Sequence, residues 1–139
     1  MSRANYSDDI DQWALIRWRG AVKSATGGKR GQQFFRDLLA ALDALPEKKL
    51  IANELIDNSS GCVCALGALG KARSIPMQDI DPEDSKRVAD AFGIADALSR
   101  EVVYMNDEHG AFNETPEKRF ARVRAWVAKQ IKPHVEAQP

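Results

Sequence analysis

Residues 34–45 read FFRDLLAALDAL, the clearest helical pattern in the chain. Apolar side chains recur here at steps of three and four, which places them on one face of an α-helix. They are Phe34, Phe35, Leu38, Leu39, Leu42 and Leu45. Pro46 follows directly. Because the residue before a proline disfavours helical geometry, the pattern predicts a helix that ends there and buries one face.

Weaker patterns of the same kind predict further helices on both sides of this one. The last has the clearest start, since Thr115 can cap it, Pro116 suits its first position and Glu117 complements its dipole. Another is expected to begin near Asp81, with Pro82 at its first position. The expected helices cover about 7–25, 34–45, 62–73, 81–92, 94–105 and 115–132. In the first, Ser7 is the expected cap, and Trp13, Ala14 and Trp18 fall on the apolar side. One core is expected to contain Phe34, Leu38, Leu42, Val88, Leu98, Val102, Phe120, Val123 and Val127.

These patterns together predict a mainly all-α protein. We expect one domain over residues 1–139, built as a compact bundle of five or six helices, with short flexible ends at about 1–6 and 132–139. Residues 48–62 fit no single pattern, and short extended pieces are expected there as the alternative to a broken helix.

Composition limits the class of protein. The chain has 139 residues, of which 44% are hydrophobic, and its 20 basic residues balance 20 acidic ones. A net charge of zero removes any general electrostatic argument for binding nucleic acid or membrane. No apolar run approaches the ~20 residues of a membrane span, and residues 1–9 lack the apolar region of a secretory signal. We expect a cytoplasmic protein with no cofactor.

Charge is nevertheless segregated along the chain. Residues 17–36 and 118–132 each hold six basic residues and no acidic one, whereas residues 79–108 hold nine acidic residues against three basic ones. The segments either neutralise one another across helix contacts or leave a polarised surface that suits a charged partner.

Residues 61–72, GCVCALGALGKA, are rich in small side chains. Gly67 and Gly70 each cost ~1 kcal/mol in a helix relative to alanine, so we expect another backbone to approach closely there. A cysteine at a helix N-terminus can also be an activated nucleophile. Cys62 and Cys64, with His109 as base, are therefore weak catalytic candidates. A metal site that adds His134 has the right ligand number but no known zinc spacing.

Two further patterns bear on binding. Residues 88–94 place Ala89 four positions before Gly93, as in a DNA-binding helix-turn-helix, but the following residues include Asp96 and Glu101, which repel phosphate. In the last helix, Trp126 lies among basic residues and is either an exposed hot spot or a core residue. The candidate partner-binding residues are Arg19, Lys23, Arg119, Arg122, Trp126 and Lys129.

Three blocks of the sequence resemble blocks in known proteins, namely residues 62–72, residues 92–108 and residues 114–120. With them, residues 6–131 resemble a group of short uncharacterised proteins of bacteria, their phages and prophages that share a CALGAL-type helix segment. The resemblance implies a phage or prophage context and supplies no site residues.

The leading functional hypothesis is a non-enzymatic interaction protein that binds a host or phage factor, with inhibition as one version. The alternative is a small nucleic-acid-binding or regulatory protein that uses the basic helices, and the third is a cysteine-dependent enzyme. A protein partner is favoured over nucleic acid because of the zero net charge and the acidic segment 79–108.

Overall fold

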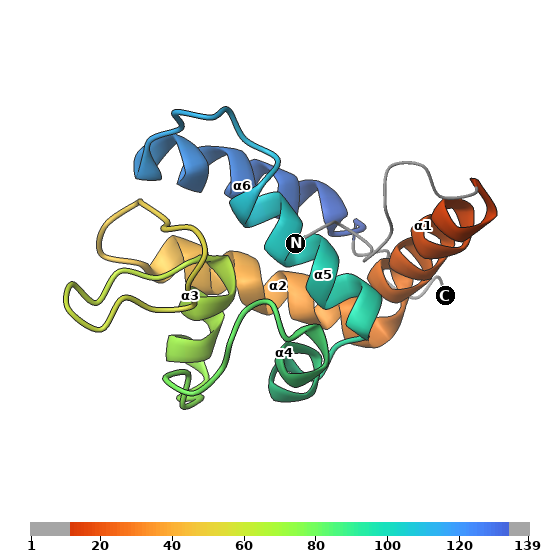
Figure 1. The fold of residues 1–139 in the computed structure, drawn as a ribbon, viewed down its shortest axis with the longest axis horizontal. Helices are drawn as coiled ribbons and strands as arrows, with labels where there is room; N and C mark the ends of the chain where they lie inside the picture. The colour runs from red at the N-terminus through yellow and green to blue at the C-terminus, as the bar shows by residue number, and fades with distance from the viewer. Residues whose placement is uncertain (1–11, 134–139) are drawn as a thin grey trace, which may run out of the picture.

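A computed structural model describes residues 12–133 of the chain, and this range folds into six helices with no strand (Figure 1). The prediction of a mainly all-α bundle is confirmed. The extended pieces expected at 48–62 reduce to one isolated antiparallel bridge between Ile56 and Val63. The helices are α1 (Gln12–Gly27), α2 (Lys29–Ala44), α3 (Ala65–Ala72), α4 (Ser85–Phe92), α5 (Asp96–Asp107) and α6 (Pro116–Gln130).

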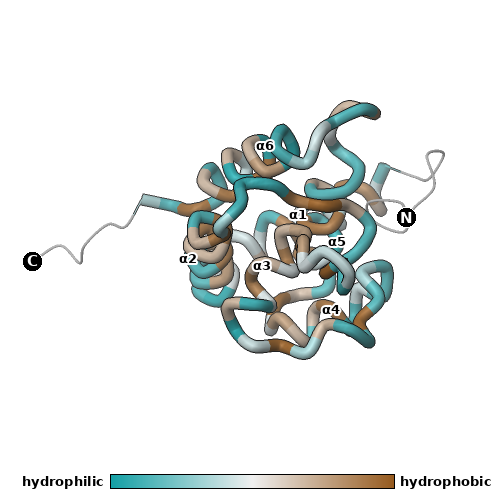
Figure 2. The backbone as a smooth tube through the Cα atoms, turned by 90° about the vertical axis from the view of Figure 1, so that its left-hand side faces the viewer, coloured by the Kyte–Doolittle hydropathy of each residue, from teal (hydrophilic) through white to brown (hydrophobic). Residues whose placement is uncertain are grey.

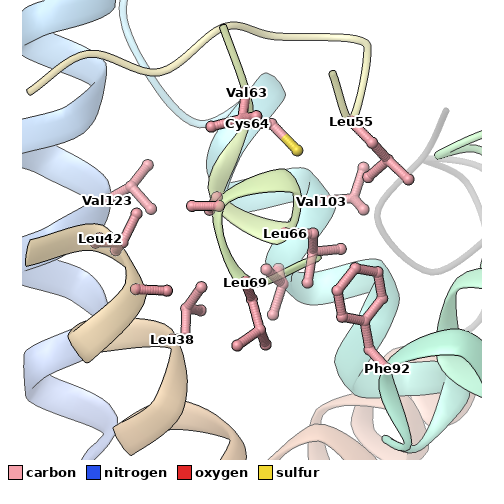
Figure 3. Packing of buried hydrophobic residues seen from close by; sticks show 14 of the residues in the cluster. Leu38, Leu42, Leu55, Val63, Cys64, Leu66, Leu69, Phe92, Val103 and Val123 are labelled. Carbon is pink, nitrogen blue, oxygen red and sulfur yellow. The ribbon is translucent and has the colours of Figure 1, made fainter. Parts of the chain in front are cut away.

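The strongly periodic segment forms α2, which packs against α1, α3 and α6. Phe35, Leu38 and Leu42 on its inner face are fully buried. In Figure 3, Leu42 points toward Val123 of α6, and Leu38 points toward Leu69 of α3. The 3.6-residue period thus predicted both the helix and the face that it buries.

The second packing element is α5, which contacts α1, α3 and α4. Figure 2 shows α3 in the middle of the view, between α2 and α5. The side chains expected to form the core all belong to one buried cluster, which confirms the helix phases. They are Phe34, Leu38, Leu42, Val88, Leu98, Val102, Phe120, Val123 and Val127.

Three predicted helix starts are wrong by several residues. α2 begins at Lys29 rather than Phe34, one turn and a half earlier than the apolar period indicated. α3 begins at Ala65 rather than Cys62, because Val63 pairs with Ile56 in extended geometry and Cys64 is the N-cap. α4 begins at Ser85 rather than near Asp81, so Pro82 is not at its first position. Residues 81–84 form a turn instead, and the Asp84 side chain caps the helix by accepting from Arg87 N.

The first helix also differs from its prediction. Its expected cap at Ser7 lies outside the described residues, as do residues 1–6 and 134–139 of the expected ends. Ala14 and Trp18 of α1 are buried, as expected. Trp13, expected on the same buried side, is 70% exposed.

The small residues of α3 permit a close contact, as predicted. A Cβ atom on Gly67 would overlap the carbonyl oxygen of Leu55, and one on Gly70 would overlap Sδ of Met77. A backbone oxygen cannot move aside as a flexible side chain can. A side chain is therefore tolerated less well at Gly67 than at Gly70.

Gly67 and Gly20 provide a matched test of this contact. We expect Gly67→Ala to destabilise the fold by about 1–3 kcal/mol through overpacking. Gly20→Ala, in an open part of α1 with no atom near the new methyl group, should stabilise it by up to about 1 kcal/mol. Urea unfolding of both variants measures the difference. Equal stability of the two variants would contradict the packing account.

Candidate interaction surface

The two cysteines occupy different environments, and neither forms a catalytic pair. Cys64 is buried, and its Sγ accepts a hydrogen bond from Gly67 N at 3.3 Å as the cap of α3. Burial raises the pKa of the Cys64 thiol to about 12, so the reactive thiolate is scarce at neutral pH. Cys62 is half-buried. Within residues 12–133, no hydrogen bond joins His109 to either cysteine, and its ring lies beside Tyr104.

The metal hypothesis also lacks support. The part of the chain that the structure describes contains no group of three or more side chains placed to hold a metal ion. His134, one of the four expected ligands, lies outside the described residues.

The start of α3 is held by Asn106, a buried residue that the sequence suggested only as a possible partner to orient His109. Its Oδ1 accepts from Ala65 N at 3.0 Å, and its Nδ2 donates to Ile51 O at 2.9 Å and to Asp107 Oδ1 at 2.7 Å. Desolvation raises the pKa of Asp107. These contacts satisfy buried polar groups, so the site has a structural role.

Two of the candidate binding residues on α6, Arg119 and Arg122, are engaged inside the protein. Arg122 donates to both carboxylate oxygens of Glu114, at 2.7 and 2.9 Å, and to Met105 O. Arg119 donates to Leu50 O at 3.1 Å, and its Nε lies 3.4 Å from Glu114 Oε1. The side chain of Glu114 is only 7% exposed. These two arginines therefore fix the loop before α6.

The other two candidates on α6, Trp126 and Lys129, differ in their exposure. The ring of Trp126 is half-buried and meets the ring of Phe35 edge-on, with 5.6 Å between centroids. Arg124, a basic residue of α6 outside the candidate set, pairs with Asp43 of α2. Lys129 is exposed. The structure therefore favours the core interpretation of Trp126, and most of the predicted α6 surface serves internal packing.

The basic residues around α1 behave differently. Arg17, Arg19 and Lys23 are exposed, and none has a hydrogen bond or ion pair with any residue of the range 12–133. The same holds for the three basic residues that follow, namely Lys29, Arg30 and Arg36. No acidic residue occurs in residues 12–36. Of the two basic segments, the N-terminal one therefore keeps its charge available.

α1 also presents apolar side chains to solvent. Trp13 is 70% exposed and Ile16 is 54% exposed. At about 100° per residue, both share a face with Arg17 and Gly20. We call Trp13, Ile16 and Arg17 the α1 outer face. Sequence reasoning selected Arg19 and Lys23 but missed Trp13 and Ile16, because apolar spacing alone placed Trp13 in the core.

A groove of about 590 Å³ runs beside the α1 outer face. Arg19 and Lys23 of α1 line it, together with Trp18, Val22, Glu101 of α5 and Lys132 beyond α6. Its volume lies in the range of small-molecule sites.

The buried side chain of Gln32 holds this groove in shape. Its Nε2 donates to Thr26 O in α1 and to Gln130 O in α6, both at 2.8 Å, and its Oε1 accepts from Lys132 N at 2.8 Å. One amide on α2 therefore joins the ends of α1 and α6. Because these bonds satisfy backbone groups at both ends, the groove is pre-formed.

The possible helix-turn-helix has the expected turn but an unsuitable second helix. Gly93 ends α4 in the left-handed region, at φ +67°. However, α5 is largely buried, including Leu98, Ser99 and Val102. Arg100, which is half-buried on that helix, pairs with Asp96. A helix packed in this way cannot enter a DNA groove as a recognition helix does.

Alkylation of the two cysteines tests whether Cys64 is buried and unreactive. In the folded protein at pH 8, iodoacetamide should modify Cys62 and leave Cys64 unmodified, because Cys64 is buried and its pKa is about 12. Mass spectrometry of the alkylated peptides reads out both sites. Labelling in denaturant should modify both cysteines, which serves as the control. If Cys64 is alkylated as fast as Cys62 in the folded state, the assignment of a structural role to Cys64 is wrong.

Glu114 gives a pH-dependent prediction. The Arg122 hydrogen bonds lower the pKa of Glu114 below its usual 4.5. A lowered carboxyl pKa contributes stability above pH 4.5 and loses it as the pH falls through the folded-state pKa. Glu114→Gln should therefore cost about 1–3 kcal/mol at pH 7 and progressively less toward pH 3. Urea unfolding across this range tests it, and a difference that does not change with pH would refute the ion-pair assignment.

Comparison with protein-family models, curated proteins and solved structures finds no match for this chain. Within the described range, no helix is both long and apolar enough to cross a membrane.

Proposed function

We propose that this chain is a non-enzymatic interaction protein that binds an acidic surface of a partner protein through the α1 outer face. One observation carries the proposal: α1 exposes Trp13 and Ile16 beside basic residues that have no internal partner among the described residues. Tryptophan and arginine are the residues that most often dominate the energy of a protein interface.

Charge supports an acidic partner. Arg17, Arg19 and Lys23 lie within two turns of α1, and their side chains are not neutralised within residues 12–133. Complementary charge raises the rate of encounter with an acidic protein and disfavours basic ones. The exposed apolar side chains then supply the affinity that charge alone does not.

A protein is a better match than nucleic acid. Phosphate binding draws on several basic contacts with the nucleic-acid backbone, whereas Trp13 and Ile16 add exposed apolar surface to the first turns of the basic helix α1. The arginines expected to support nucleic-acid binding, Arg119 and Arg122, bind Glu114 instead. Residues 79–108 also bring nine acidic residues, which oppose association with a polyanion.

The cysteine-enzyme hypothesis has the least support, given the buried Cys64 and the separate environment of His109. We extend the proposal to the setting implied by the resemblance of residues 6–131. In that setting the protein acts inside a bacterial cell, and its partner is a host or phage factor that it inhibits by occupying a surface.

The proposal predicts that Trp13 is the energetic centre of the interface. Immobilised protein should retain an acidic partner from bacterial lysate, and Trp13→Ala should weaken binding of that purified partner about 30-fold, as expected for a 2 kcal/mol hot spot. Calorimetric titration gives the affinity. Phe112→Ala is the matched control, since Phe112 is a fully exposed aromatic residue on the loop between α5 and α6.

Two results would contradict the proposal. One is a partner whose affinity falls with Phe112→Ala and not with Trp13→Ala. The other is sub-micromolar binding of random duplex DNA at about 0.15 M salt that declines steeply with added salt, which would support nucleic-acid binding.

A further inference from the structure

The groove beside α1 combines an apolar wall with a basic rim. Trp18 and Val22 line it with apolar surface, and Arg19 and Lys23 extend from the same helix. Lys132, more than a hundred positions later in the chain, adds a third basic side chain. The packing of the helices thus places three basic side chains around one groove.

Within residues 12–133, these basic residues outnumber the acids that line the groove. Over the same range, Arg19 and Lys23 have no ion pair, and the Lys132 ammonium donates a hydrogen bond to the carbonyl oxygen of Gly27, at 3.4 Å. Glu101 is the one carboxylate among the described lining residues. Three positive charges against one negative charge leave a local excess that favours an anion.

The groove is also pre-organised. Gln32 fixes Thr26, Gln130 and Lys132 by three hydrogen bonds, each of 2.8 Å. A ligand that enters does not have to order the backbone of the site, which reduces the entropic cost of binding. The volume of about 590 Å³ exceeds what one inorganic ion requires and suits a small organic molecule.

We propose that this groove binds a small organic anion that has a flat apolar body and one carboxylate, sulfonate or phosphate group. The apolar body lies against Trp18 and Val22, and the anionic group lies between Arg19, Lys23 and Lys132. The groove shares Arg19 and Lys23 with the basic surface of the proposed interface, but neither Trp13 nor Ile16 lines it. Binding of a small anion there can therefore be measured without the protein partner.

The probe for this site is 8-anilinonaphthalene-1-sulfonate, an aromatic sulfonate that fluoresces when it leaves water. Titration of the folded protein should show one saturable site with a Kd on the order of 10 μM, as expected for a ligand of this size. Decanoate should displace the probe. Decanol, which has the same chain without the charge, should displace it far less.

Two variants with the same change of net charge test the location. Arg19→Glu/Lys23→Glu should weaken probe binding about tenfold or more, because it reverses two charges of the rim. Arg17→Glu/Lys29→Glu, at exposed positions outside the groove, should leave binding within about twofold. Circular dichroism confirms that both variants remain folded.

Amide chemical shifts of the wild-type protein give an independent readout that needs no variant. We expect the probe to change the amide chemical shifts of residues 18–27 and 130–132 and to leave those of α3 unchanged. The inference is overturned by the absence of saturable binding, by equal displacement with decanoate and decanol, by equal losses in the two variants, or by shifts centred elsewhere.

Discussion

The packing of one face of α2 against three other helices is the contact on which the rest of the structure depends. Phe35, Leu38 and Leu42 are fully buried there, and each contributes about 1.5–3 kcal/mol through removal of apolar surface from water. Through this packing, α2 contacts α1, α3 and α6 directly. Once the helices are placed, the positions of a few carboxylates decide which charged surfaces remain available to a partner.

The described carboxylates that form ion pairs with α6 arginines lie beside that helix, whereas among the described residues the groove beside α1 is lined by one carboxylate, Glu101. Glu114 binds Arg119 and Arg122, and Asp43 binds Arg124. No acidic residue occurs in residues 12–36. The two basic segments have the same number of basic residues but differ in the described structure. The arginines of α6 hold loops and helices together, whereas Arg17, Arg19 and Lys23 of α1 have no ion pair within residues 12–133. The exposed Trp13 and the groove held by Gln32 reinforce that division.

The sequence predicted what depends on local periodicity. The helix at 34–45, its buried face and the Thr115 cap follow from spacing and capping chemistry, and Gly67 signalled a close backbone contact. Contacts between distant residues were not predictable in this way. The pairing of Arg122 with Glu114 depends on how a loop turns back onto α6, and the exposure of Trp13 depends on which side of α1 meets α5. Both follow from tertiary packing, which a helical period in the sequence does not reveal.

Calorimetric unfolding of two double charge reversals tests the division between the basic segments most directly. Arg119→Glu/Arg122→Glu should lower the unfolding free energy by about 3 kcal/mol or more, because it leaves Glu114 facing two like charges in a poorly hydrated site. Arg19→Glu/Lys23→Glu should change it by less than about 0.5 kcal/mol, as expected for exposed residues without partners. Equal losses in both variants, or a larger loss in the α1 variant, would contradict the account.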